Sequence, residues 1–231
     1  MTVNTEQFDT YTGEPDIERL IRAFKRQEID RVPNFEVLIE DMHVEKILGR
    51  YAGNTLAFGG DPAKGVVDPK KCRPMKPLDY IELCRIIGQD ARVIESIWPP
   101  YRREDKDGKL VQVFDRSIKN LADYRKLKQP DIKDINRVVY YIREYKEAAA
   151  NTKIGVSILF GPVFTYFYEF LIGMHDFMIA CFEDRLWVEE MLEDVTAYWI
   201  EMSKAAVKEG VDFIWPAHLT QLLIIFHMRI L

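Results

Sequence analysis

Carboxylates and one histidine stand inside or directly after the apolar runs of this 231-residue chain. Glu36 and Glu40 lie within and just after the first run, and Glu95 lies near the end of the second. His218 follows the fourth. Such groups transfer protons, and a charge in an apolar run is costly unless it faces a cavity. The sequence therefore predicts catalytic roles for Glu95 and His218 and substrate binding by Glu36 and Glu40, with an acidic N-cap of the next helix as the alternative for the latter pair.

The third apolar run leads directly into an aromatic segment. Residues 154–160 read IGVSILF, which is typical of a strand buried on both faces of a parallel sheet, and Gly161 and Pro162 end it. Phe164, Tyr166 and Tyr168 then follow in a segment that is expected to be a loop. Ligands of α/β proteins bind at the carboxyl ends of strands, so we expect Phe164 and Tyr166 to contact substrate. Packing with a satisfied hydroxyl is the alternative for the two tyrosines.

Helices and strands that position these groups alternate along the chain. Apolar spacing and capping residues predict helices over residues 17–24, 78–87, 117–127, 134–150 and 184–209. Apolar runs predict strands over residues 32–39, 91–98, 154–160 and 211–215. Asp107-Gly108, followed by alternating residues, indicates a hairpin after the second strand, and residues 52–77 read as a long surface loop.

The strands recur roughly every sixty residues with a helix before each, which predicts a parallel α/β sheet. A TIM (β/α)8-type barrel and an open doubly wound sheet both fit this order, and the wide spacing without a GxGxxG motif favours the barrel. It would be incomplete, with about four or five of the eight βα units. We expect an arm over residues 1–15, a partial barrel over 16–217 and an apolar tail over 218–231 that is either native, truncated or out of frame.

Composition excludes several classes of function. A net charge of −5 gives no basic stripe for nucleic acid, and no run approaches the ~18 apolar residues that a membrane span needs. The amino terminus lacks the features of a signal peptide, so we expect a cytoplasmic protein. Cys72, Cys84 and Cys181 are far apart and form no CxxC pair, which predicts neither a disulfide framework nor a local zinc site.

Several short motifs, in order and spacing, resemble the uroporphyrinogen decarboxylase superfamily. They are ERLIRAF at 18–24, DRVP at 30–33, IGQDA at 87–91, GPVFT at 161–165, GM at 173–174 and EGVD at 209–212. The resemblance covers about residues 16–216 and implies a TIM barrel whose last strands are absent from this chain. It also places Tyr168 one position before a tyrosine that is functional in the family, which implies a catalytic role for its phenol.

The resemblance distinguishes two branches. The decarboxylases carry an arginine motif after the first strand that binds substrate carboxylates, whereas this chain has acids from Glu36 to Asp41. They also carry an aspartate after the second strand, and Glu95 is the nearest carboxylate, out of register. The cobamide-dependent methyltransferases lack the arginines and activate a thiol with zinc held by a His-x-Cys pair and a later Cys, ligands that this chain does not contain in that pattern.

The expected function is therefore a methyltransferase-type enzyme that binds a corrinoid or tetrapyrrole, free or on a corrinoid protein. We expect no metal site in this fragment, and zinc with a corrinoid in a complete homologue. As it stands, the chain is expected to catalyse neither decarboxylation nor thiol methylation. The alternatives are a uroporphyrinogen decarboxylase and a non-catalytic half-barrel that forms a homodimer through an exposed sheet edge.

Overall fold

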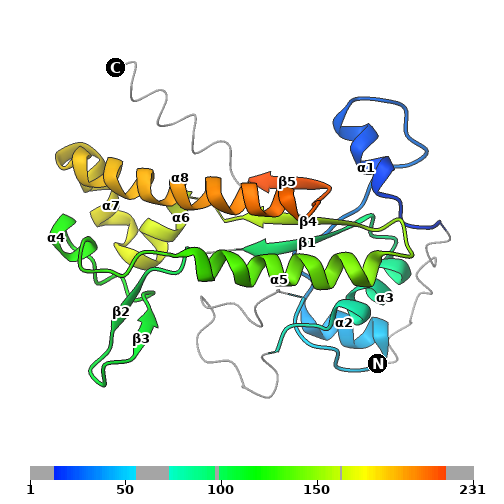
Figure 1. Cartoon of the computed structure of the whole chain (residues 1–231), viewed down its shortest axis with the longest axis horizontal. Helices are drawn as coiled ribbons and strands as arrows, with labels where there is room; N and C mark the ends of the chain where they lie inside the picture. Colours follow the sequence, from blue (N-terminus) through cyan, green and yellow to red (C-terminus); the bar gives the residue numbers. More distant parts are fainter. Residues whose placement is uncertain (1–12, 56–72, 97–98, 162, 217–231) are drawn as a thin grey trace, which may run out of the picture. The chain divides into compact units, whose positions relative to one another are not determined.

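The computed structural model describes residues 13–55, 73–96, 99–161 and 163–216. These residues fall into two compact units. Unit 1 comprises residues 13–55, 73–94 and 142–157, and unit 2 comprises the described residues of 95–141 and 158–216. Figure 1 shows the order of the elements along the chain. No helix in the described ranges has the length and apolarity to cross a membrane.

A three-stranded parallel sheet confirms the predicted α/β class. Its strands are β1 (Ala91–Ser96), β4 (Gly155–Phe160) and β5 (Phe213–Pro216), in the order β1-β4-β5. All six residues of β4, the central strand, are buried, as the continuous apolar run predicts. A complete barrel is not formed by these three strands, so the barrel remains a prediction.

Unit 1 contains three short helices. They are α1 (Ile17–Phe24), α2 (Asp41–Leu48) and α3 (Pro77–Ile87), and the last eight residues of α5 (Ile132–Ala149) also belong to it. The Asp16 side chain accepts a hydrogen bond from Glu18 N and so caps α1. Gly88 ends α3 at φ 70°, a left-handed conformation that costs glycine little. Both helix ends match the sequence prediction.

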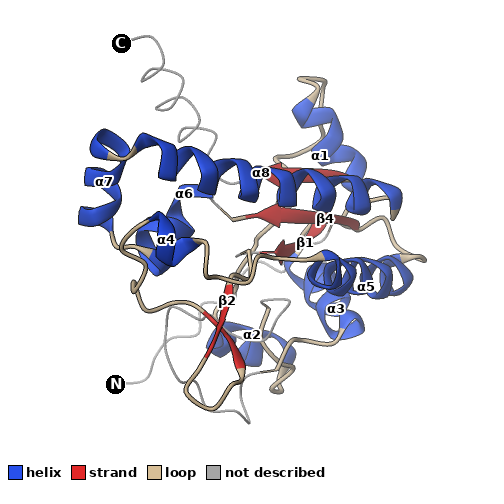
Figure 2. Cartoon of the chain, turned by 60° about the vertical axis from the view of Figure 1, so that its left-hand side comes forward, coloured by secondary structure: helices blue, strands red, loops and turns tan. Residues whose placement is uncertain are grey.

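Unit 2 holds most of the remaining helices. Besides the start of α5 they are α4 (Leu121–Tyr124), α6 (Val163–Tyr166), the π-helix η3 (Phe167–Leu171), α7 (Met174–Glu183) and α8 (Arg185–Lys208). Strands β2 (Arg102–Glu104) and β3 (Leu110–Gln112) form the predicted antiparallel hairpin, with Arg103 opposite Val111. Figure 2 distinguishes these helices from the strands by colour.

The strand predicted over residues 32–39 is wrong. This segment is irregular because side chains, rather than a neighbouring strand, bind much of its backbone. Asn34 N donates to Asp90 Oδ2 at 2.9 Å, and Gln89 Nε2 donates to Glu36 O at 2.8 Å. Ile39 N donates to Thr55 Oγ1 at 3.0 Å. Residues 56–72 of the predicted loop lie outside the described residues.

One predicted helix and one predicted loop also need correction. The helix expected over 117–127 is reduced to the four residues of α4, which begins only at the Asn120 cap. Asn120 Oδ1 accepts from Asp123 N at 2.9 Å, and a side chain that caps the backbone in this way fixes the start of a helix. The aromatic segment after β4 is not a loop: it forms α6 and η3 without interruption.

Candidate functional site at the carboxyl end of the sheet

Glu95 is the fifth residue of β1 and is half-buried. Three positions earlier, the Arg92 guanidinium lies over the rings of Tyr80 and Tyr145, with Cζ 4.0 and 4.9 Å from their centroids. Arg92 therefore points to the face of β1 that α3 and α5 cover. Because side chains alternate along a strand, Glu95 projects from the opposite face.

The residues after β4 reach the same edge of the sheet as Glu95. Neighbouring parallel strands end at a common edge, and β1 and β4 are neighbours. Phe160, the last residue of β4, stacks on Trp199 of α8 with ring centroids 4.8 Å apart. α6 then begins within three residues. This carboxyl edge is where parallel α/β sheets place their ligands.

A π-helix shapes this edge. Ile172 N donates to Phe167 O at 2.8 Å, the five-residue spacing that defines such a turn. Thr165 and Tyr168 flank its start, and their hydroxyl oxygens lie 3.0 Å apart on half-buried side chains. Single π-turns occur frequently at functional sites because they redirect side chains that a regular helix would stack. The Thr165 and Tyr168 hydroxyls are therefore candidates for ligand contact.

The segment around Arg116 holds the π-helix in place. Arg116 Nε donates to Glu169 O and Arg116 N donates to Phe170 O, both at 2.8 Å. Ile118 N donates to Leu171 O at 3.0 Å. The last carbonyl groups of a helix lack partners within it, and these three donors satisfy them. The end of η3 is thereby fixed to a second part of unit 2.

Tyr166 and Phe164 belong to an aromatic cluster next to this pair. Tyr166 is fully buried, stacks on Tyr101 at 5.8 Å between centroids, and donates from its hydroxyl to Val113 O at 3.0 Å. Burial raises the pKa of its phenol. These contacts match the packing alternative, and they leave Tyr166 no exposed surface for a substrate. Phe164 is half-buried and packs against Phe177, with ring centroids 5.7 Å apart.

The other predicted site residues lie elsewhere. Glu36 and Glu40 are exposed side chains of unit 1. Glu40 occupies the predicted N-cap position of α2, but its side chain makes no capping hydrogen bond there. His218 lies outside the described residues. Glu95 and Tyr168 thus belong to unit 2, whereas Glu36 and Glu40 belong to unit 1.

Sequence reasoning missed a buried phenol pair that leads to Asp194. The hydroxyl of Tyr124 donates to Asp194 Oδ2 at 2.7 Å and lies 3.2 Å from the hydroxyl of Tyr101. Burial raises the pKa of both phenols, so both stay protonated and neutral. Asp194 stands four residues before Tyr198 and seven before Glu201 on α8. This spacing, which places the three polar residues on one side of a helix, is the sequence signal that could have indicated a polar site on α8.

No metal site can be built from the residues that the structure describes. Within the described ranges, no group of three or more His, Cys, Asp or Glu side chains is placed to hold an ion. Cys84 is buried in α3, where burial raises its thiol pKa to about 12, and Cys181 lies on α7. These residues do not fit the zinc centre that the resemblance implies, so we derive no step through zinc.

Comparison with known proteins gives a likeness to a solved structure. No family model matches the sequence, and no curated protein matches it. Among solved structures, a methyltransferase from Methanosarcina mazei matches with a TM-score of 0.50 and 15% identity. In fold, the chain is similar to a methyltransferase. The match covers 87% of this chain but 58% of the other, so this chain spans little more than half of that enzyme's length.

Proposed function

We propose that this chain is a methyltransferase-type protein of the corrinoid-linked branch of the uroporphyrinogen decarboxylase superfamily. The observation that carries the proposal is the fold likeness to a methyltransferase over 87% of the chain. The ordered motifs between residues 18 and 212 support the same superfamily. The ligand would bind at the carboxyl edge of the sheet, against Glu95 and the Thr165–Tyr168 hydroxyl pair.

The polar groups at this edge distinguish a corrinoid from a porphyrinogen. Corrinoid side chains end in neutral amides, which can donate to the Glu95 carboxylate and exchange hydrogen bonds with Thr165 and Tyr168. A uroporphyrinogen presents several carboxylates, which need guanidinium or ammonium partners. A half-buried glutamate repels such a substrate. The chemistry of this edge therefore supports the methyltransferase branch over the decarboxylase branch.

Equilibrium dialysis of the purified chain against methylcobalamin and against uroporphyrin tests the proposal. We expect methylcobalamin to be retained at least about tenfold more tightly than uroporphyrin. Glu95→Gln and Tyr168→Phe should each weaken methylcobalamin binding by about threefold to tenfold, because each removes a hydrogen bond. The exposed Glu193 and Tyr140 supply the matched controls Glu193→Gln and Tyr140→Phe, which should bind like the unmodified chain. Tighter binding of uroporphyrin would support a decarboxylase, and binding of neither compound would refute the site.

Self-association is a second candidate function, supported by an apolar stripe on α7. Met174, Met178 and Phe182 recur every four residues on one side of this helix, and all three are exposed. Two copies can cover such a stripe by packing it against itself about a twofold axis. Light scattering should then give twice 27.1 kDa, and Phe182→Asp should restore the monomer. A monomeric mass for the unmodified chain would exclude this candidate.

A further inference from the structure

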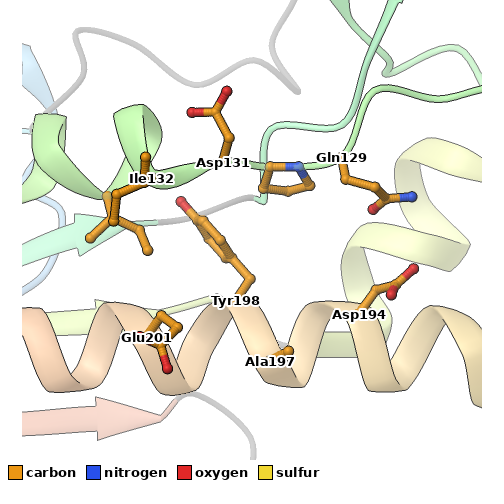
Figure 3. Close-up of a pocket in the computed structure, with 9 residues that line it drawn as sticks. Gln129, Asp131, Ile132, Asp194, Ala197, Tyr198 and Glu201 are labelled. Carbon is orange, nitrogen blue, oxygen red and sulfur yellow. The ribbon is translucent and has the colours of Figure 1, made fainter.

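A cavity of about 340 Å³ opens in unit 2 between the start of α5 and the middle of α8 (Figure 3). It is separate from the Thr165–Tyr168 pair, neither of which lines it. Its walls consist of Gln129, Pro130, Asp131, Ile132, Ile135, Asp194, Ala197, Tyr198 and Glu201. A volume of this size lies within the range of small-molecule sites.

Hydrogen-bond acceptors and apolar groups make up most of the lining. Asp131, Asp194 and Glu201 carry carboxylates, and Gln129 adds an amide oxygen. Among the described residues that line the cavity, none is Lys, Arg or His. Figure 3 shows Gln129 and Asp194 at one end and Glu201 toward the other, with Ala197 and Tyr198 between them. The cavity is therefore suited to a ligand with positive ends and an apolar middle.

At the first end, two acceptor oxygens can take a ligand's N–H groups. Gln129 Oε1 is buried and has no hydrogen-bond partner within the described part of the chain. A buried acceptor without a partner is costly, and a donor from a ligand would remove that cost. Tyr124 donates to Asp194 Oδ2 at 2.7 Å, which fixes the carboxylate and leaves Oδ1 for an ammonium group.

At the second end, a ligand can replace a weak surface ion pair. Glu201 Oε1 accepts from Lys204 Nζ at 2.7 Å, and the two side chains are 58% and 67% exposed. Ion pairs this exposed contribute little to stability, because water screens the two charges. An ammonium group of a ligand that is held at both ends of the cavity can therefore displace Lys204 from Glu201.

Arg102, which acts electrostatically on Asp131 and Tyr198 of the lining, is paired with Asp134. Arg102 donates to both carboxylate oxygens of Asp134, with Nη1 3.0 Å from Oδ2. Tyr198 is held neutral because burial, with Asp134 next in importance, raises the pKa of its phenol. The lining therefore carries a net negative charge, which Lys204 offsets in part at Glu201.

Spacing along α8 decides the shape of the ligand. Asp194 and Glu201 are seven residues apart, which is about two helical turns and roughly 10 Å along one face. Ala197 and Tyr198 lie between them along α8 (Figure 3), and Pro130 and Ile132 add apolar surface to the lining. We propose that the cavity binds a linear aliphatic diamine or polyamine along α8, with an ammonium group at Asp194 and Gln129 and another at Glu201. This site is independent of the proposed activity.

Calorimetric titration with 1,6-diaminohexane at low salt tests the site, with n-hexylamine as the singly charged analogue of equal length. We expect the diamine to bind at least about tenfold more tightly than the monoamine, because only the diamine engages both ends. Asp194→Asn should weaken the diamine about tenfold and Glu201→Gln about threefold to fivefold. Glu201→Gln should leave binding of n-hexylamine within about twofold, because its one ammonium group can bind at Asp194.

Glu193→Gln is the matched control, since Glu193 is an exposed neighbour of Asp194 that does not line the cavity. It should leave the diamine affinity within about twofold. Equal affinity for the diamine and the monoamine would overturn the proposal, and so would an equal loss in Glu193→Gln and Asp194→Asn. Glu201 is exposed, so Glu201→Gln should fold normally. It therefore still tests the site if Asp194→Asn does not fold.

Discussion

Two carboxylates of one strand segment have opposite environments. Asp90, directly before β1, is fully buried and accepts four hydrogen bonds, from Arg19 Nη1, Arg31 Nη2, Asp16 N and Asn34 N, at 2.5 to 3.0 Å. Glu95, near the end of β1, is half-buried and lies on the opposite face of the strand from Arg92. A carboxylate bound by four fixed donors is an anchor of the fold. The carboxyl end of β1 is the end at which chemistry can take place.

The family resemblance depends largely on the anchored end. Arg19 comes from ERLIRAF, Asp30 and Arg31 from DRVP, and Asp90 from IGQDA. Arg19 binds Asp90 and also donates to both oxygens of Asp30, at 2.6 and 2.9 Å. Motifs that are distant in sequence thus meet in one ion cluster of unit 1. They identify how the amino end of the sheet is built, and they say little about a substrate.

Removing the charge at the anchor should have the largest effect on stability. Asp90→Asn leaves Arg19, which is 8% exposed, without its buried carboxylate. We expect the free energy of unfolding to fall by about 3–5 kcal/mol, because breaking a buried ion pair leaves an uncompensated charge. Urea denaturation followed by circular dichroism measures this change.

Asp79→Asn is the control for that experiment. Asp79 pairs with Arg50 at 2.8 Å, but Arg50 is 45% exposed. Its loss should lower the free energy of unfolding by less than about 1 kcal/mol. If Asp90→Asn and Asp79→Asn were equally mild, the Asp90 cluster would not be the anchor described above.

A second change at the amino end should have an intermediate effect. Gly155 begins β4, and its N–H donates to Asp90 O at 2.9 Å. A Cβ at Gly155 would come within 2.5 Å of Ile17 Cγ1 in α1. Gly155→Ala should therefore destabilise the chain by about 1–3 kcal/mol through overpacking. In a thermal-melt double-mutant cycle, Ile17→Ala should recover part of that loss, and additive effects would contradict this direct contact.

Periodicity predicted the regular elements of the fold well. The buried run of β4, the Asp16 cap of α1 and Gly88 after α3 are local signals, and each matches the structure. The prediction of a strand over 32–39 was wrong. It used only the apolar composition of the segment itself, whereas the backbone of this segment is hydrogen-bonded to the distant side chains of Asp90, Gln89 and Thr55. A single sequence does not show that distant side chains will bind a backbone.

The site was less predictable for the same reason. Strand order predicted that the residues after β4 follow the same edge of the sheet as Glu95, but it did not reveal that Tyr166 is buried in an aromatic cluster. Nothing in the composition of residues 163–171 distinguishes a π-helix from a loop. The cavity beside α8 is lined by residues 129–135 and 194–201, and a single sequence does not show that these two distant segments meet.

At the carboxyl end, the neutral exchange Glu95→Gln sharpens the comparison with Asp90→Asn. We expect it to change the free energy of unfolding by less than about 1 kcal/mol, because residues placed for function are rarely optimal for stability. Urea denaturation under the conditions used for Asp90→Asn makes the two values comparable. If the free energy of unfolding fell by about 3 kcal/mol or more, as expected for a buried ion pair, Glu95 would be a residue that stabilises the fold and not a residue of the site.

Acid pH should reveal the smallest effect, at the rim of the anchored cluster. The Arg19 guanidinium, which donates to Asp30, lowers the pKa of that carboxyl from 3.8 to about 2. Because the folded state holds the proton less tightly than the unfolded state, this contribution to stability is complete above about pH 4 and is lost as the pH falls toward 2. Thermal melts between these limits should show a shallower loss of Tm with falling pH for Asp30→Asn than for the unmodified chain. If Tm fell with pH equally in both proteins, the pairing of Arg19 with Asp30 would not contribute to stability. The ion cluster would then depend on Asp90 and not on Asp30.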